Sequence, residues 1–201
     1  DRLLIIIHHL VVDTVSWRIL LEDLLTAYEQ LAQAQRVRLP PKTTSFQYWS
    51  HKLTEYAQSN AVRDELSYWV SMIGDWDGRL PRDYADDAQA NTEASARMVV
   101  GTLDEEETRA LLQEIPTAFG TEINDALLTA LAQIFSRWTG SRSLLVELEG
   151  HGREDLFDDV DVSRTVGWFT TVLPVRLGVL DGGLETLKAI KEQLRAIPKH
   201  G

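Results

Sequence analysis

Two adjacent histidines, His8 and His9, are followed by an aspartate, Asp13, four residues after the second of them. Histidine is the side chain best suited to transfer protons near neutral pH. The pair follows an apolar run over residues 3–7 that has the composition of a buried strand. Burying an imidazole at the end of such a strand costs free energy unless the ring is hydrogen-bonded or takes part in chemistry. Two interpretations therefore stay open, a proton-transfer site and a polar strand end.

A second group with chemical potential occupies the segment EGHGRE, residues 149–154, directly after an apolar run. It places the carboxylate of Glu149, the imidazole of His151 and the guanidinium of Arg153 within a few residues of one another. Glycines on both sides of His151 allow backbone conformations that other residues resist. On its own, a charged segment with glycines is more typical of a turn than of a site.

A third segment, residues 161–170, contains Trp168 and on its own indicates the start of a strand with aromatic packing. Adjacent histidines on a strand point to opposite faces, so His8 and His9 are unsuited to one ion, and we expect no metal site. Ser16 lacks the GxSxG pattern of a nucleophile elbow. The chain contains no HExxH motif and no Walker-type loop.

The composition narrows the class of protein. The chain has 201 residues, 44% of them hydrophobic, and a net charge of −11, which argues against a nucleic-acid partner. It has no cysteine, no apolar run of about 20 residues and no signal peptide, so we expect a cytoplasmic protein without membrane contact. It begins without Met in an apolar strand, and we expect it to be a piece of a longer polypeptide.

The elements that must position these groups alternate between strands and helices, which predicts a mixed α and β class. We expect strands over residues 3–8, 97–103, 144–148 and 170–177. We expect helices over residues 15–35, 61–73 and 184–197. Three more helices should begin at a cap: one at Ser45, one at a capping box of Asp104 and Glu107, and one at Thr121. In the 61–73 helix the residues expected inward are Leu66, Trp69, Val70 and Ile73.

The motifs together resemble one family, the epimerization domains of nonribosomal peptide synthetases within the condensation-domain superfamily. The matching segments, in family order, are HHLVVDTVSWRILLEDL (8–24), TEINDALLTAL (121–131), EGHGRE (149–154), DVSRTVGWFTTVLPV (161–175) and KEQLRAIPKHG (191–201). The His-His-xxx-Asp pattern is shared across the superfamily, whereas EGHGRE and RTVGWFT are more specific to epimerization. Two departures are Thr14, where glycine often follows the aspartate, and Leu173, where an aromatic residue is common.

The resemblance implies a mixed α/β (α+β) fold like that of chloramphenicol acetyltransferase, two-lobed and here incomplete. Residues 1–80 would form the C-terminal part of the first lobe and carry the His-His motif. Residues 81–96 would be a linker or crossing, and residues 97–201 the first part of the second lobe, with EGHGRE.

The resemblance also implies a reaction, inversion of an α-carbon from L to D in an aminoacyl or peptidyl thioester. His9 and Glu149 would be the acid–base pair, acting on opposite faces of that carbon. The resemblance implies that His8 and Asp13 are orienting or structural residues. It implies that His151, Arg153 and Trp168 shape the site.

The same resemblance indicates the partners. No cofactor would bind directly, because the substrate rides on the phosphopantetheine of a peptidyl carrier domain in cis, next to adenylation and condensation domains. We expect the chain alone to be inactive. Two alternatives stay open, a condensation domain that forms peptide bonds and a non-catalytic fragment that docks a carrier.

Overall fold

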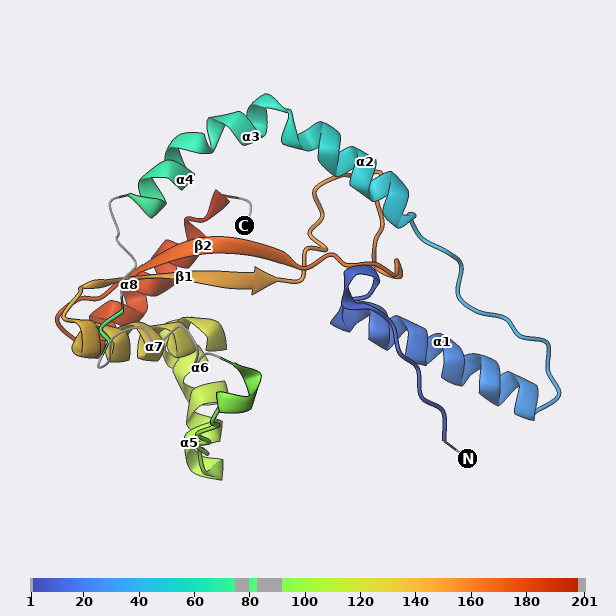
Figure 1. Cartoon of the computed structure of the whole chain (residues 1–201), viewed down its shortest axis with the longest axis horizontal. Coiled ribbons are helices and arrows are strands. Elements are labelled where there is room, and N and C mark those ends of the chain that lie inside the picture. The colour runs from blue at the N-terminus through green and yellow to red at the C-terminus, as the bar shows by residue number, and fades with distance from the viewer. Residues whose placement is uncertain (1, 75–79, 83–91, 199–201) are drawn as a thin grey trace. The chain divides into compact units, whose positions relative to one another are not determined.

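The computed structural model describes residues 2–74, 80–82 and 92–198 (Figure 1). The chain forms two compact units. The first combines the residues up to Val70 with Leu148–Leu173, and the second combines Ser71–Glu147 with Pro174–His200. The predicted lobe bounds stay a prediction, and most of the predicted linker over 81–96 lies outside the described residues.

The first unit begins with an extended segment and a short 3₁₀ turn, η1 (His9–Val11), that leads into helix α1 (Thr14–Ala32). Asp13 is the N-cap of α1, since its side chain accepts a hydrogen bond from the backbone N–H of Ser16. This places the aspartate of the His-His-xxx-Asp pattern at the junction of turn and helix. The helix predicted over residues 15–35 is confirmed.

Two more helices of the first unit follow, α2 (Phe46–Ala57) and α3 (Asn60–Asp64). The predicted cap is confirmed, because the Ser45 hydroxyl accepts a hydrogen bond from the N–H of Tyr48 at 3.1 Å. Instead of one helix over 61–73, the chain forms α3 and a separate helix, α4 (Leu66–Ile73).

The core of the first unit joins α2 to the segment after EGHGRE. Trp49, Val162 and Phe169 are buried together. The ring of Phe169 lies 4.6 Å from that of Trp49 and 5.2 Å from that of Phe46, centroid to centroid. Such aromatic clusters favour tilted and edge-to-face contacts, which is the arrangement found here. The 161–170 segment is therefore anchored through Phe169.

The second unit contains the remaining helices, and its core includes the part of a two-stranded sheet that lies before Leu148 and after Leu173. Its helical elements are η2 (Glu93–Ser95), α5 (Glu105–Arg109), the π-helical η3 (Ala110–Glu114), α6 (Ile115–Phe119), α7 (Ile123–Thr139) and α8 (Gly183–Arg195). Helices α7 and α8 pack on each other beside the sheet (Figure 1). Val175, Leu177 and Ile190 are almost fully buried there.

Strands β1 (Ser143–Gly150) and β2 (Thr171–Gly178) form the sheet and confirm two of the predicted strands. Arg142 accepts a hydrogen bond from Val179, and Gly150 lies opposite Thr171, so the strands run antiparallel. EGHGRE thus begins at the end of β1, and the 161–170 segment leads into β2.

The strands predicted over residues 3–8 and 97–103 are wrong, since neither segment is a strand. Both have apolar composition, but a strand exists only through its hydrogen-bonded partner, and no described residue pairs with either. Leu4 and Ile6 are about 80% exposed, and Val99 is 97% exposed. The apolar composition of these two segments indicates burial, but their side chains are largely exposed in this chain.

Two finer predictions about helices also differ from the structure. The inward face predicted for 61–73 is largely exposed, because Leu66, Val70 and Ile73 are 63%, 62% and 49% exposed. The cap of α7 is Glu122, whose N–H donates to the Asp125 carboxylate, rather than Thr121. The Asp104–Glu107 capping box of α5 is confirmed.

No helix of the described part of the chain is both long enough and apolar enough to span a bilayer.

Candidate functional site

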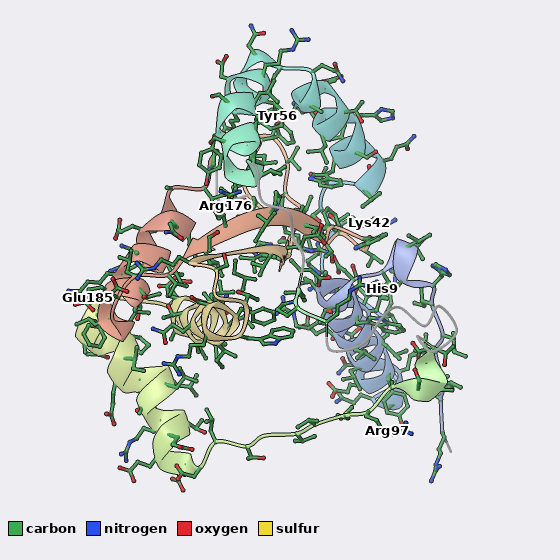
Figure 2. All side chains as sticks on the ribbon, turned by 60° about the vertical axis from the view of Figure 1, so that its left-hand side comes forward. His9, Lys42, Tyr56, Arg97, Arg176 and Glu185 are labelled. Carbon is green, nitrogen blue, oxygen red and sulfur yellow. The ribbon has the colours of Figure 1, made fainter. Side chains whose placement is uncertain are left out.

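His9 lies on the short turn before α1 (Figure 2), and its ring orientation is set by the backbone of that turn. The Nδ1 atom is 2.8 Å from the carbonyl oxygen of Val12. A carbonyl oxygen only accepts hydrogen bonds, so Nδ1 carries the proton and donates it. In neutral His9 the lone pair is therefore on Nε2, which is the atom able to take a proton from a substrate.

A small hollow of about 140 Å³ opens beside this imidazole. Its lining residues are Ile7, His9, Val12, Asp13, Thr14 and Trp17. His9 itself is exposed, so its Nε2 is not enclosed by the described chain. His8 has a different environment, because its Nδ1 accepts the N–H of Leu10 at 3.1 Å and so caps the turn. This contact fits the structural role predicted for His8.

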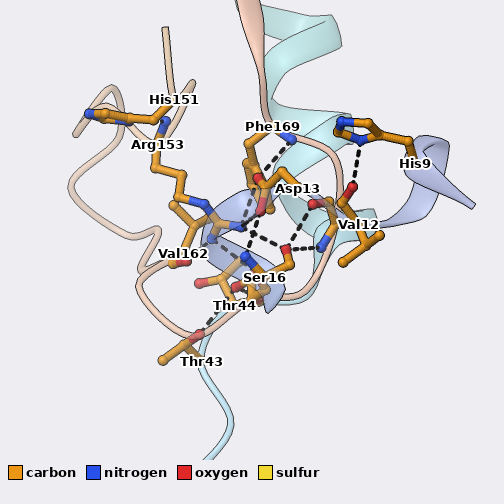
Figure 3. Close-up of polar contacts among 12 residues, drawn as sticks. His9, Val12, Asp13, Ser16, Thr43, Thr44, His151, Arg153, Val162 and Phe169 are labelled. Carbon is orange, nitrogen blue, oxygen red and sulfur yellow. Dashed lines mark hydrogen bonds and ion pairs between the residues drawn. The ribbon is translucent and has the colours of Figure 1, made fainter. Parts of the chain in front are cut away.

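Asp13 and Arg153 form a buried ion pair that joins the His-His-xxx-Asp turn to EGHGRE (Figure 3). One terminal nitrogen of Arg153 donates to both carboxylate oxygens of Asp13, at 3.0 and 3.1 Å. The other donates to the carbonyl oxygens of Val162 and Thr165, at 2.7 and 2.9 Å. The guanidinium also stacks on Phe169, 4.0 Å from the ring centroid. Arg153 thereby fixes Asp13 and the segment before β2 together.

Hydrogen bonding lowers the pKa of Asp13. Burial alone would raise this pKa, but hydrogen bonds from Ser16 and the guanidinium of Arg153 outweigh burial, so it lies below its ordinary value of 3.8. Asp13 is thus an ionised, fully hydrogen-bonded carboxylate near neutral pH. Such a carboxylate is suited to orienting its neighbours and is a poor proton donor near neutral pH.

The lowered pKa of Asp13 predicts how acid affects this part of the fold. A carboxyl whose pKa is depressed by folding contributes stability that is fully present above its unfolded pKa, about 3.8, and is lost as pH falls through the folded value. Hydrogen exchange of peptides covering residues 10–20 and 162–170, corrected for intrinsic pH effects, should therefore be faster in Asp13→Asn than in wild type. We expect this difference to be constant from about pH 7 to pH 5 and to shrink below pH 3.8. An undiminished difference at about pH 3 would contradict the assignment.

Ser16 is the site residue that the sequence reasoning missed. It is fully buried, and its hydroxyl both donates to the carbonyl of Gly167 at 2.9 Å and accepts the N–H of Gly167 at 3.0 Å. The same hydroxyl accepts a hydrogen bond from Arg153 at 3.1 Å. The sequence gives a signal only for the backbone contact, because any non-proline residue three positions after an N-cap aspartate can donate its N–H to that aspartate.

Trp168 lies next to His9, with ring centroids 5.9 Å apart and ring planes inclined by 44°. Its neighbour Phe169 donates a backbone N–H to Asp13 at 3.3 Å. The structure therefore brings Trp168, Arg153, Asp13 and His9 into one cluster within the first unit. Three separate sequence motifs supply these four residues.

Glu149 and His151 are not part of that hydrogen-bonded cluster. Glu149 is the second-last residue of β1, and its side chain is exposed on the same face of the strand as Glu147. His151 accepts the N–H of Arg153 at 3.0 Å, pairs with Glu154 at 3.3 Å, and lies on the opposite side of Arg153 from His9 (Figure 3). The placement of Glu149 across a substrate path from His9 stays a prediction.

Gly152 is required by the shape of EGHGRE. Its φ of +64° lies in the left-handed region, and an added Cβ would stand 1.6 Å from the carbonyl oxygen of Phe169. Glycine at this position lets Arg153 leave the end of β1 in the direction of Asp13.

Gly152→Ala should consequently displace the Phe169 backbone and loosen the Arg153–Asp13 pair, which costs more than the ~1 kcal/mol expected from backbone strain alone. The matched control is Gly140→Ala, because Gly140 has a φ of +74° but open space around it. Hydrogen exchange of residues 162–170 in both variants is the measurement. Equal behaviour of the two variants would show that close approach to Phe169 is unimportant.

In this mixed α/β chain, a buried ion pair holds the turn that carries His9, and a small hollow opens beside that turn. These features together define a candidate proton-transfer site. The condensation-domain family matches residues 1–201, and the chain belongs to this family. Among similar proteins are a linear gramicidin synthase of Brevibacillus parabrevis, 52% identical over 202 residues, and chondramide synthase of Chondromyces crocatus, 49% identical over 206. These alignments cover all of this chain but only 3% and 5% of the two synthases.

Solved structures confirm the predicted fold class, the mixed α/β fold of the chloramphenicol acetyltransferase type. The epimerization domain from the third module of tyrocidine synthetase B superposes with a TM-score of 0.85 and 40% identity, over 97% of this chain and 44% of that one. The first condensation domain of the calcium-dependent antibiotic synthetase has a TM-score of 0.74 at 19% identity, over 96% of this chain and 42% of that one. The second likeness shows the fold alone.

Proposed function

We propose that this protein epimerizes the α-carbon of an aminoacyl or peptidyl group carried as a thioester on the phosphopantetheine arm of a carrier domain. The observation that carries the proposal is the 40% identity, over 97% of the chain, with an epimerization domain. The segments EGHGRE and RTVGWFT, which resemble those of epimerization domains, also support the proposal. They supply Arg153 and Trp168 to the cluster around His9.

The proposed chemistry is two proton transfers on opposite faces of the α-carbon. Nε2 of His9 takes the α-proton, the Cα–H bond breaks, and its electron pair moves toward the thioester carbonyl oxygen. The carboxyl group of Glu149 then donates a proton to the other face and becomes a carboxylate, and a new Cα–H bond forms. The same steps in reverse convert D to L, and exchange with solvent restores the protonation states. Hydrogen-bond donors near the carbonyl oxygen would stabilise the enolate-like intermediate.

The geometry of His9 supports its part in this scheme. The Val12 carbonyl holds the proton on Nδ1, so Nε2 is a ready acceptor without prior tautomer exchange. Asp13 is engaged by Ser16, Arg153 and Phe169, which leaves it an orienting role.

The proposal implies a peptidyl carrier domain as the immediate partner, in cis, beside adenylation and condensation domains. Such a domain would bring the thioester to the site, and the chain itself would need no bound cofactor.

The direct test uses the full-length protein loaded separately with the L- and the D-aminoacyl carrier thioester. An epimerase brings both starting materials to the same D/L ratio, which chiral chromatography of the released amino acid measures. Starting materials that keep their configuration would refute the proposal.

The second candidate is peptide-bond formation, favoured by the family match, which is to condensation domains as a whole. A condensation catalyst needs two carrier-bound substrates and yields a dipeptidyl thioester. Adding an acceptor aminoacyl carrier to the same assay separates the two functions. Dipeptide without convergence of the D/L ratio would favour condensation.

A further inference from the structure

The backbone on both sides of Trp168 is held by the two buried polar residues that begin α1. Ser16 hydrogen-bonds both the N–H and the carbonyl of Gly167, at 3.0 and 2.9 Å. Asp13 accepts the N–H of Phe169 at 3.3 Å. Gly167, Phe169 and Ser16 are all buried. The residue between these contacts, Trp168, therefore has little freedom to move its backbone.

Trp168 is nevertheless 41% exposed, unlike its two neighbours. Here the held backbone presents the indole at the side of His9, 5.9 Å between ring centroids. His9 is thus constrained at two places, by the Val12 carbonyl at Nδ1 and by the indole beside its ring.

We propose that Trp168 is a positioning residue for His9: the indole limits rotation of the imidazole and favours the imidazolium that forms when His9 takes the α-proton. A positive charge over the face of an aromatic ring is stabilised when it lies within about 6 Å of the ring centroid. The proposal rests on the proposed epimerization, because it assigns Trp168 an effect only through the proton transfer by His9.

A double-mutant cycle in the full-length protein tests this role. The variants are Trp168→Leu and Trp168→Phe, each alone and combined with His9→Ala, and the assay is the initial rate of deuterium wash-in at the α-carbon. We expect Trp168→Leu to slow the rate about tenfold and Trp168→Phe to restore most of it. In the His9→Ala background Trp168→Leu should cause no further loss, because the group through which it acts is gone.

The matched control is Trp138→Leu, which removes another half-exposed tryptophan, on α7, and should leave the rate unchanged. A tenfold loss from Trp168→Leu in both backgrounds would overturn the positioning role and make Trp168 an independent wall of the site. An unchanged rate in Trp168→Leu would overturn it as well.

Failure of the underlying function gives a different result. If wild type shows neither wash-in nor inversion, the epimerase proposal falls and the role of Trp168 falls with it. If wild type inverts but His9→Ala keeps the full rate, epimerization stands while the roles of His9 and Trp168 are both overturned.

Discussion

His9→Ala is expected to slow inversion of the carrier-bound residue by about 10²- to 10⁴-fold while leaving amino-acid loading intact. The physical reason is the loss of Nε2, the nitrogen kept free by the hydrogen bond from Nδ1 to Val12. Alanine also removes that hydrogen bond, but His9 is exposed, so the fold should tolerate the change. The measurement is the D/L ratio of the carrier-bound residue over time in the full-length protein.

The control for this experiment is the adjacent histidine. His8→Ala removes a similar exposed imidazole whose only described contact is the cap of the turn, with Leu10. We expect His8→Ala to retain far more activity than His9→Ala. Wild-type inversion by His9→Ala, or equal losses in the two variants, would contradict the assignment of His9.

The second large effect is expected from Arg153→Met, which removes one partner of the buried ion pair. Both side chains are less than a tenth exposed, so methionine would leave the Asp13 carboxylate buried and short of donors. Loss of one partner of such a pair typically costs about 3–5 kcal/mol. Hydrogen exchange over residues 13–20 and 162–169 should therefore become faster, because this region opens locally more often. The rate of inversion should fall as well.

Arg142→Met is the matched control, because it breaks an ion pair with Asp181 in which both side chains are largely exposed. Exposed pairs contribute little, so we expect no clear change in exchange or inversion. Arg153→Lys keeps the charge but loses the planar fork that reaches Asp13, Val162 and Thr165 together, and should rescue only part of the effect. Similar exchange in Arg153→Met and Arg142→Met would show that the buried pair does not hold the site together.

Local patterns in the sequence predicted the starts of α2 and α5 correctly because a helix start depends mainly on residues close in the chain. Ser45 caps α2 through Tyr48, three residues on, and Asp104 caps α5 through Glu107 at the same spacing. The strands at residues 3–8 and 97–103 were wrong for the opposite reason. Their apolar composition says nothing about which segment, if any, supplies the hydrogen-bonded partner.

The candidate site shows the same limit. The sequence contains His9, Asp13, Arg153 and Trp168, but no local rule pairs Asp13 with a guanidinium 140 residues away. The resemblance to a family marked these residues as important, and the geometry then related them to one another. No local pattern predicts the use of the Ser16 hydroxyl, because it holds the backbone of Gly167, 151 residues away in the sequence.

The measurement that tests the central proposal most directly is inversion of the carrier-bound L-residue in D₂O by the full-length protein, followed by mass spectrometry of the separated enantiomers. If a proton leaves the α-carbon to Nε2 of His9 and returns on the opposite face, each newly formed D-residue should carry deuterium at the α-carbon. Deuterium incorporation should slow by about 10²- to 10⁴-fold in His9→Ala. Inversion without deuterium, or a dipeptide formed with the α-carbon unexchanged, would contradict the account.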